Sequence, residues 1–293
     1  MVARCQAEFG LLAMQPVGPN AARLVELARQ FPQTKVATVV DNQDTLKEIE
    51  RVAANSSVDL TVFVDIDNGM GRTGIRCGDE CFELYARLVE SESVRVGGLH
   101  VYDGHIHDHD LSERRENVVH AMTEVLAFRS RLQDAGFPVP QLIAGGTPSF
   151  PIHAAFEDRI CSPGTPVFWD AGYAKSFPDL EFLPAAVLLT RVLSKLSGNR
   201  VCTDLGYKAV AAEMPKPRVQ FLNVDVIQEC SHSEEHLVIE LAPDCEVAVG
   251  DMLYALPIHI CPTVARHENL LVVEDGAVVD TWSVTARNRK ITI

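Results

Sequence analysis

The feature that most constrains the fold is an alternation, across the first 170 residues, of short β-branched runs with longer amphipathic stretches. The runs predicted as strands are Leu11–Gln15, Val36–Val40, Leu60–Ile66, Val96–Val101, Leu142–Ala144 and Pro166–Trp169. The stretches predicted as helices are Pro19–Phe31, Gln43–Ala54, Glu80–Glu90 and Ser112–Ala135. Strands that alternate with helices in this way predict a parallel sheet, either closed into a barrel or open and doubly wound.

The rest of the chain has a different pattern, in which short alternating runs are separated by turns and no long helical stretch occurs. The runs predicted as strands are residues 185–193, 200–211, 218–229, 236–242, 252–260, 270–274 and 277–285. Such a series predicts an all-β barrel or sandwich. We therefore predict two domains, residues 1–172 and residues 173–293.

The length of the first domain limits how many strand–helix units it can hold. A complete β/α barrel has about 250 residues in eight units, or about 30 residues a unit. By this measure the first domain holds about six units. The sequence therefore predicts a TIM-type β/α barrel domain without its first two units, followed by an all-β C-terminal domain. An open sheet is the alternative.

Charge and cysteine usage exclude several classes of partner. A formal net charge of -14 argues against nucleic acids and anionic membranes, because both repel an acidic surface. No apolar run approaches the roughly 20 residues that a membrane helix requires. The eight cysteines are scattered without a CxxC pair, which favours reduced thiols in the cytoplasm over a disulfide framework.

Two motifs follow predicted strands of the first domain. The strand Leu60–Ile66 leads into Asp67-Asn68-Gly69-Met70-Gly71-Arg72-Thr73-Gly74, a glycine-rich loop with one arginine. The next strand leads into Tyr102-Asp103-Gly104-His105. Because ligands bind at the carboxyl ends of parallel strands, Arg72 is a candidate binding residue. An ordinary turn with a surface arginine is the plain alternative.

The histidines after this strand allow a second interpretation. His107 and His109 are assigned to a solvated loop. The functional alternative is a metallohydrolase that binds its metal through His105, His107 and His109. Against it, the histidines follow the glycine turn and do not lie inside a strand.

Two further glycine motifs lie beside predicted strands, and the first of them is a candidate phosphate loop. Gly145-Gly146-Thr147 follows a predicted strand and precedes a predicted helix start, where unhindered backbone amides bind anions. Ser162-Pro163-Gly164-Thr165 precedes the last predicted strand of the first domain. A plain turn is the commoner meaning of either motif alone.

The second domain carries a candidate metal pair. His259 and Cys261 lie two residues apart in a predicted strand, so their side chains are expected on one face. Imidazole nitrogen and thiolate sulfur together suit zinc. Coincidence is the alternative for an isolated H-x-C.

Together these motifs resemble the D-serine dehydratase/D-threonine aldolase-like family, which has the alanine racemase-like fold. The matching patterns are D-x-G-M-x-R-x-G, G-L-x-x-Y-x-G-H, the two glycine loops and P-x-H-x-C-P-T-V. The resemblance implies a homodimer that binds pyridoxal 5'-phosphate (PLP), and a zinc ion on His259 and Cys261. The residues implied in PLP binding are Arg72, Tyr102, His105, Gly145, Gly146, Thr147, Ser162, Gly164 and Thr165.

The resemblance also implies a Schiff-base lysine at the end of the first barrel strand, and no segment of the chain matches it. Lys35 begins a predicted strand and Lys47 lies in a predicted helix, while the other five lysines lie beyond residue 172. We therefore leave the catalytic residue unassigned. We interpret the chain as shortened at its N-terminus and expect it to be inactive alone.

The implied function is the elimination of water from a D-3-hydroxy amino acid such as D-serine, which yields a 2-oxo acid and ammonia. Cys261 favours this reaction, because D-threonine aldolases of the family have a carboxylate at the matching position. Retro-aldol cleavage is one alternative. A catalytically dead protein that binds PLP or another small ligand is the other.

Overall fold

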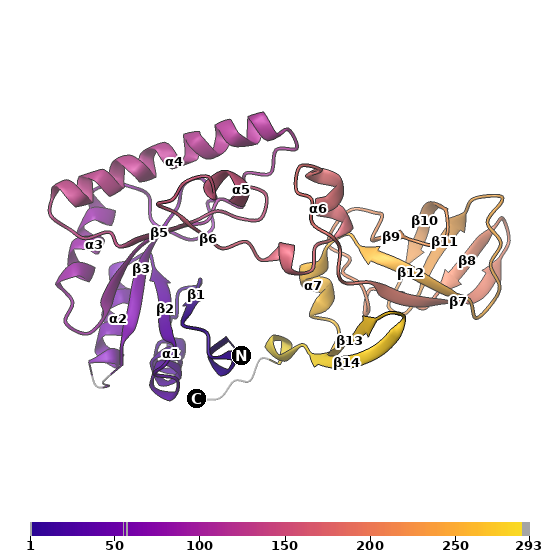
Figure 1. Ribbon diagram of the computed structural model, residues 1–293, viewed down its shortest axis with the longest axis horizontal. Helices are drawn as coiled ribbons and strands as arrows, with labels where there is room; N and C mark the ends of the chain where they lie inside the picture. Colours follow the sequence, from indigo (N-terminus) through magenta and orange to yellow (C-terminus); the bar gives the residue numbers. More distant parts are fainter. Residues whose placement is uncertain (1, 55, 57, 289–293) are drawn as a thin grey trace. The chain divides into compact units, whose positions relative to one another are not determined.

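The computed structural model describes residues 2–54, 56 and 58–288 (Figure 1). The chain forms two compact units, and the second unit begins at Thr165. We retain the domain boundary after residue 172 as a proposal. None of the helices in the described ranges is both long and apolar enough to cross a membrane.

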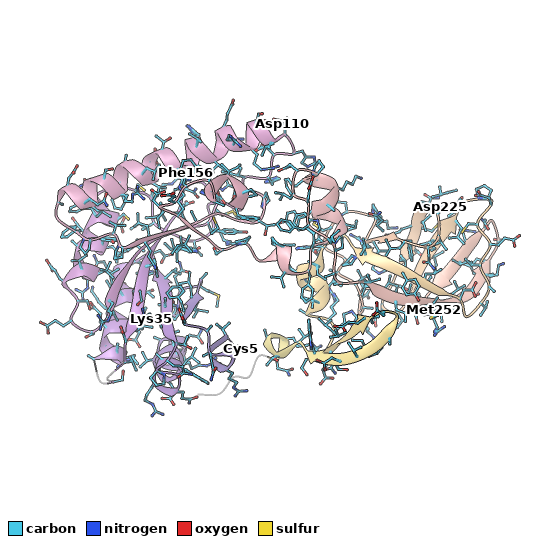
Figure 2. The ribbon with its side chains drawn as sticks, in the orientation of Figure 1. Cys5, Lys35, Asp110, Phe156, Asp225 and Met252 are labelled. Carbon is cyan, nitrogen blue, oxygen red and sulfur yellow. The ribbon has the colours of Figure 1, made fainter. Side chains whose placement is uncertain are left out.

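The first unit is a six-stranded parallel sheet whose strands are hydrogen-bonded in chain order. Its strands are β1 (Phe9–Leu12), β2 (Lys35–Val40), β3 (Leu60–Ile66), β4 (Arg95–Val101), β5 (Gln141–Ala144) and β6 (Ile160–Cys161). Its helices are α1 (Pro19–Gln30), α2 (Gln43–Ala53), α3 (Asp79–Glu90), α4 (Leu111–Asp134) and α5 (Phe150–His153). Parallel strands in chain order with a helix between each pair are the repeating units of a β/α barrel. Lys35, the first residue of β2, lies at the amino end of this sheet (Figure 2).

The two faces of this sheet have different neighbours. Alternate strand residues such as Val62 and Val64 pack against α1 to α4 in the largest apolar core of the described chain. The opposite face has only a small apolar cluster that includes Phe63. Asp65 follows Phe63 by two residues, so its side chain leaves the strand on this second face. Polar groups therefore collect near the carboxyl end of the face that the helices do not cover.

The second unit is antiparallel throughout its described strands. One sheet has six strands in the order β10-β11-β8-β7-β12-β9, and β13 pairs with β14 in a separate hairpin. The strands are β7 (Leu188–Leu196), β8 (Arg200–Thr203), β9 (Val219–Phe221), β10 (Val226–His232), β11 (Leu237–Leu241), β12 (Met252–Pro257), β13 (Asn269–Glu274) and β14 (Ala277–Ser283). Two short helices, α6 (Ala171–Ser176) and α7 (Ile260–Val264), complete the unit. The predicted fold class, a β/α barrel-type unit followed by an all-β unit, is confirmed.

The predicted strand Pro166–Trp169 is wrong. Thr165–Val167 form a 3-10 turn, and the sixth strand is β6. Proline has no N–H to donate to a sheet, and the amides of Phe168 and Trp169 both donate to the Thr165 carbonyl. These local bonds satisfy the backbone without a neighbouring strand.

The predicted strand 252–260 is also too long. β12 ends at Pro257, and α7 begins at Ile260. The Ile260 amide donates to a carboxylate oxygen of Asp170 (3.0 Å), which caps the helix at its first residue. His259 is therefore the N-cap residue of α7 and Cys261 lies in its first turn, so neither residue is on a strand.

Candidate functional site

The loop after β3 presents Arg72 at the carboxyl end of the first sheet. Asp67 Oδ1 accepts hydrogen bonds from the amides of Gly69 (3.0 Å) and Gly71 (2.9 Å), which closes the loop before the arginine. Both glycines have positive φ angles, 127° and 62°, that other residues rarely adopt. The Arg72 guanidinium carbon lies 4.9 Å from the centroid of the Tyr102 ring. The structure thus brings together two residues from separate predicted motifs.

Unpaired polar atoms are buried in the same loop and in the loop after β4. A Cβ atom added to Gly69 would lie 2.9 Å from His105 Nε2, so the imidazole packs directly over this glycine. His105 Nδ1 and both polar side-chain atoms of Asn68 are buried, with no hydrogen-bond partner among the described residues. Buried polar atoms are normally paired, so these atoms indicate a place for a polar ligand or water. Asn68 occupies an unspecified position of its motif, and no pattern indicated it.

A buried network fixes the loop that contains Gly145 and Gly146. Asp103 Oδ1 accepts hydrogen bonds from the Gly146 amide (2.7 Å) and from Ser149 Oγ (2.6 Å). Asp103 Oδ2 accepts a hydrogen bond from His153 Nε2 (2.7 Å). Burial raises the pKa of Asp103, but hydrogen bonds from His153 and Ser149 outweigh it and hold the pKa below its ordinary value. Sequence reasoning missed Asp103, Ser149 and His153, because their contacts join segments more than 40 residues apart.

The same network limits what the glycine loop can offer to an anion. The Gly145 amide donates to the Val101 carbonyl (3.1 Å) and the Gly146 amide to Asp103, so both amides have partners within the chain. Helix α5 is only four residues long. A phosphate at this loop would therefore need donors other than these two amides.

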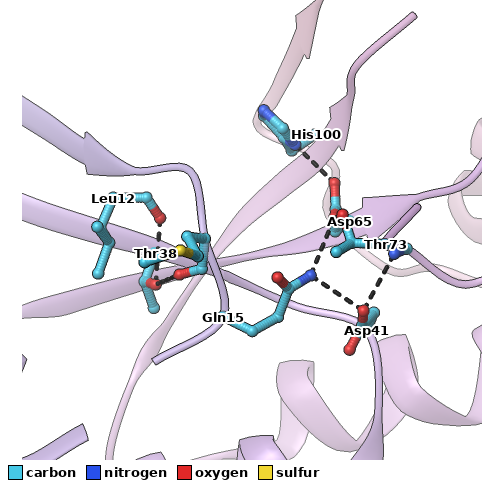
Figure 3. Close-up of polar contacts among 9 residues, drawn as sticks. Leu12, Gln15, Thr38, Asp41, Asp65, Thr73 and His100 are labelled. Carbon is cyan, nitrogen blue, oxygen red and sulfur yellow. Dashed lines mark hydrogen bonds and ion pairs between the residues drawn. The ribbon is translucent and has the colours of Figure 1, made fainter. Parts of the chain in front are cut away.

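Another polar network lies at the ends of β1 to β4 (Figure 3). It consists of Gln15, Asp41, Asp65, Thr73 and His100. His100 Nδ1 donates to Asp65 Oδ1 (2.7 Å), and both residues are buried. Nothing in the local sequence indicated this set, because each member comes from a different segment.

Among the remaining predicted residues of the first unit, Thr147 is buried but two others are less enclosed. Ser162 and Gly164 follow β6 and are exposed. A Cβ atom added to Gly164 would meet no atom within 4 Å, so close packing does not require glycine there. Both stay predicted binding residues.

A surface pocket of the first unit lies away from this edge. It has a volume of about 490 Å³ and is lined by residues 58–60 and 91–95. These residues are at the amino ends of β3 and β4. Because barrel enzymes bind their ligands at the other end of the strands, we assign this cavity no function.

In the second unit, the structure brings His259 and Cys261 together by a helix turn. Each side chain shifts the pKa of the other, and Thr165 Oγ1 lies 3.6 Å from Cys261 Sγ. The hydrogen bond from His259 lowers the pKa of the Cys261 thiol below its ordinary value. The hydrogen bond to Cys261 raises the pKa of His259 to about 9, with a contribution from Glu213. The pair therefore favours a thiolate, the form of cysteine that binds metals.

Glu213 binds one of the two imidazole nitrogens of His259. His259 Nδ1 donates to Glu213 Oε1 at 2.5 Å, so Nε2 is the nitrogen that this carboxylate does not use. Sequence reasoning missed Glu213, which lies 46 residues before the histidine. Within the described ranges, no group of three or more His, Cys, Asp and Glu side chains is arranged to hold a metal ion.

Asp170 holds this helix turn in place. One carboxylate oxygen accepts the Tyr173 amide of α6 (2.8 Å) and the other accepts the Ile260 amide of α7 (3.0 Å). Losing a helix cap costs typically about 1 kcal/mol, so Asp170→Ala should lower the free energy of unfolding by about 2 kcal/mol. Urea unfolding followed by circular dichroism measures the change. A loss below about 0.5 kcal/mol, like that of an ordinary surface substitution, would contradict the double cap.

Comparison with known proteins identifies the family of the first unit. The family model described as "Alanine racemase, N-terminal domain" matches residues 13–170, more than half of the chain. The chain belongs to the alanine racemase N-terminal domain family. The model described as "Putative serine dehydratase domain" matches residues 185–273. This second match places the chain in the D-serine dehydratase/D-threonine aldolase-like branch, and the resemblance drawn from the motifs is confirmed.

Several named proteins are similar in sequence or structure to this alanine racemase-like chain. A D-threonine aldolase of Arthrobacter sp. is 27% identical over 281 residues, which cover 94% of this chain and 73% of that protein. The crystal structure of D-threonine aldolase from Filomicrobium marinum is 24% identical with a TM-score of 0.87, covering 95% of this chain and 76% of that chain. A D-threo-3-hydroxyaspartate dehydratase, solved with a cysteine replaced by alanine and described as metal-free, is 18% identical with a TM-score of 0.71. That match covers 94% of this chain and 78% of that chain.

Neither described lysine of the first unit follows a strand at the carboxyl edge of its sheet. Lys35 begins β2 at the opposite edge, and Lys47 lies in α2. The others belong to the second unit: Lys175 in α6, Lys195 in β7, Lys208 paired with Glu234 and Glu235, and Lys216 bound to backbone carbonyls. Lys290 lies outside the described residues.

Proposed function

We propose that the protein is a PLP- and zinc-dependent lyase that eliminates water from a D-3-hydroxy amino acid, yielding a 2-oxo acid and ammonia. The relatives are named for D-threonine and D-threo-3-hydroxyaspartate, which are both D-amino acids with a hydroxyl group on Cβ. The observation that carries the proposal is that His259 and Cys261 lie two residues apart at the start of α7, as its N-cap residue and in its first turn. It supplies a nitrogen and a sulfur donor at one place.

The first unit has groups that fit PLP. The cofactor is an anion with a phosphate and an oxygen-substituted ring, so it requires cationic and hydrogen-bonding partners. Arg72 has the Tyr102 ring as its partner and no carboxylate among the described residues, while Asn68 and His105 keep unpaired buried atoms. When bound, PLP supplies an electron sink for negative charge at the substrate Cα. The residues of this unit that would hold it are Arg72, Tyr102, His105, Thr147, Ser162 and Gly164, while Gly145 and Gly146 would line the site without donating their amides.

The second unit has a donor set that fits zinc. Imidazole with thiolate suits zinc better than magnesium or calcium, which prefer oxygen ligands. A zinc ion there would supply a Lewis acid for a hydroxyl leaving group. The named dehydratase gives independent support, since its metal-free variant lacks a cysteine and another variant lacks a histidine two positions earlier. This is the same spacing as that of His259 and Cys261.

The side chains of this protein have separate tasks in the proposal. Glu213 accepts the Nδ1 proton of His259 and so keeps Nε2 directed to the metal position. Arg72 binds and orients the anionic cofactor, and Asp103 holds the glycine loop. No described lysine of the first unit follows a strand at the carboxyl edge of its sheet, so we leave the group that moves the Cα proton unassigned.

Retro-aldol cleavage is the second candidate, and the relatives favour it. The curated relative from Arthrobacter and the structure from Filomicrobium both have the name D-threonine aldolase. Cleavage breaks the Cα–Cβ bond and yields glycine with an aldehyde. Elimination keeps that bond and yields a 2-oxo acid, so the products separate the two reactions.

Product analysis with D-serine and D-threonine tests the proposal. We expect pyruvate from D-serine, and 2-oxobutyrate from D-threonine in preference to glycine and acetaldehyde. The protein is assayed with PLP and zinc, with methylamine as an added base, and also with any in-frame sequence encoded upstream of Met1. Glycine and aldehyde as the main products would replace elimination by retro-aldol cleavage. Bound PLP without either set of products would favour the non-catalytic alternative.

The predicted homodimer and cytoplasmic location are parts of the same proposal. Light scattering of the purified protein measures the oligomer directly, and a monomer at micromolar concentration would exclude the homodimer. Cell fractionation tests the location.

A further inference from the structure

We infer that Gln15, Asp41 and Asp65 are positioning residues for Arg72 and thereby set how tightly the site binds an anionic cofactor. The inference rests on the proposed function, because it takes Arg72 as a cofactor-binding residue. The three side chains lie at the carboxyl ends of three neighbouring strands, and their contacts are shown in Figure 3.

The two carboxylates hold the residues that directly follow Arg72. Thr73 Oγ1 donates to Asp65 Oδ2 at 3.0 Å. The Gly74 amide donates to Asp41 Oδ2, also at 3.0 Å. Since Asp67 already binds the amides before the arginine, the loop is anchored on both sides of Arg72. The backbone on which the guanidinium stands is therefore fixed to the sheet.

Gln15 joins the two anchors. Its Nε2 atom donates to Asp41 Oδ2 (3.0 Å) and to Asp65 Oδ2 (2.9 Å). A primary amide has two N–H donors on one nitrogen, so it can serve both carboxylates and add no charge. Two neighbouring carboxylates repel each other, and this shared donor offsets the repulsion. Replacement of Gln15 would therefore disturb both anchors together.

The anchors are themselves rigid. His100 Nδ1 of β4 donates to Asp65 Oδ1 at 2.7 Å, and Asp65 and His100 are 5% and 6% exposed. Gly74 has a φ of 99°, and a Cβ atom there would lie 2.6 Å from the Asp67 amide nitrogen, so the loop closes tightly on itself. Side chains from β3 and β4 and from the segments after β1 and β2 thus fix one loop.

Arg72 depends on this anchoring because its own contact is weak. Its described partner is the half-exposed Tyr102 ring, and a cation–π contact at such a site holds a guanidinium only loosely. A guanidinium held by a buried ion pair would keep its position when the loop moves. The Arg72 guanidinium has no such ion pair among the described residues, so the loop anchors determine its position.

Substitutions at Gln15 and Thr73 separate positioning from general stability. Gln15→Ala removes the shared donor, and Gln15→Glu places a third carboxylate between the two. Thr73→Val removes the hydroxyl donor at nearly constant shape, whereas Thr73→Ser keeps it. Gln30→Ala is the matched control, because Gln30 makes an exposed amide-to-carboxylate bond to Glu26 on α1.

Two measurements are made on the full chain: PLP affinity by fluorescence titration, and hydrogen exchange of residues 73–75. We expect Gln15→Ala, Gln15→Glu and Thr73→Val to bind PLP about tenfold more weakly, and to exchange these amides at least about tenfold faster. Thr73→Ser and Gln30→Ala should stay within about twofold of wild type.

The possible failures are distinguishable. Unchanged exchange at residues 73–75 in Gln15→Ala and Thr73→Val would contradict the anchoring itself. Faster exchange with unchanged PLP affinity would leave the network a structural role and overturn the positioning of Arg72. Wild-type protein that does not bind PLP would overturn the proposed function, and the positioning role with it, whatever the exchange rates show.

Discussion

Replacing both His259 and Cys261 by alanine is expected to weaken zinc binding at least about 100-fold, or about 2.7 kcal/mol in binding free energy. The two residues lie at the N-cap and in the first turn of α7, and Glu213 orients the imidazole. Two ligands removed together leave a metal ion only solvent and the nearby Glu213. Competition with a chromophoric chelator measures the affinity, and metal analysis of the dialysed protein measures the zinc content.

A matched double variant controls for the loss of one histidine and one cysteine. His236→Ala with Cys230→Ala removes the same two residue types at an exposed and a half-exposed position of the second unit. This control should retain the wild-type affinity. If the His259→Ala, Cys261→Ala variant also retained its zinc, the metal would lie elsewhere. The histidines 105, 107 and 109 of the metallohydrolase alternative would then be examined next.

The second large effect is expected from Asp103→Ala, which should lower the free energy of unfolding of the first unit by about 3–5 kcal/mol at pH 7. The carboxylate is 1% exposed and accepts hydrogen bonds from Gly146, Ser149 and His153. Its removal leaves three buried donors without their acceptor. Urea unfolding followed by circular dichroism measures the loss.

The effect of Asp103 should also depend on pH, and its direction follows from the lowered pKa. Because the folded protein holds the pKa of Asp103 below its ordinary value, the carboxylate stabilises the fold fully above that value, near 3.8. The stabilisation is lost as the pH falls further, through the folded pKa. The difference between wild type and variant should therefore be constant from pH 5 to 7 and shrink below about pH 4. A difference that grew in acid would contradict the assignment, and Asp134→Asn, at the exposed end of α4, should show neither effect.

The fold was predictable from the sequence because its signals are local. The helices α1 to α4 begin and end within one residue of the predicted stretches. Apolar periodicity and helix caps such as Asn42 depend only on residues that are close together in the sequence. The predictions were wrong where a side chain distant in sequence decides the backbone. Asp170 caps α7 although it lies 90 residues earlier in the sequence. The predicted strand 252–260 therefore ends early, and a helix begins at Ile260.

The candidate site was predictable in part for the same reason. Arg72 and Tyr102 were predicted from motifs at the ends of adjacent strands, and the structure brings them together. The networks of Asp103 and Gln15 were missed, because their partners come from separate loops and no local pattern marks them. The glycine loop is the opposite case, in which a local motif misleads. Its sequence predicts an anion site, but the Gly146 amide donates its hydrogen bond to the Asp103 carboxylate of the same chain.

The double cap made by Asp170 has a practical consequence for anyone who cuts this chain into pieces. A fragment that starts at residue 173 would leave behind the carboxylate that begins α7 and the Thr165 hydroxyl beside the Cys261 sulfur. Such a fragment would contain both proposed zinc ligands and yet lack the groups that set their geometry. A fragment intended to bind metal should start before Thr165.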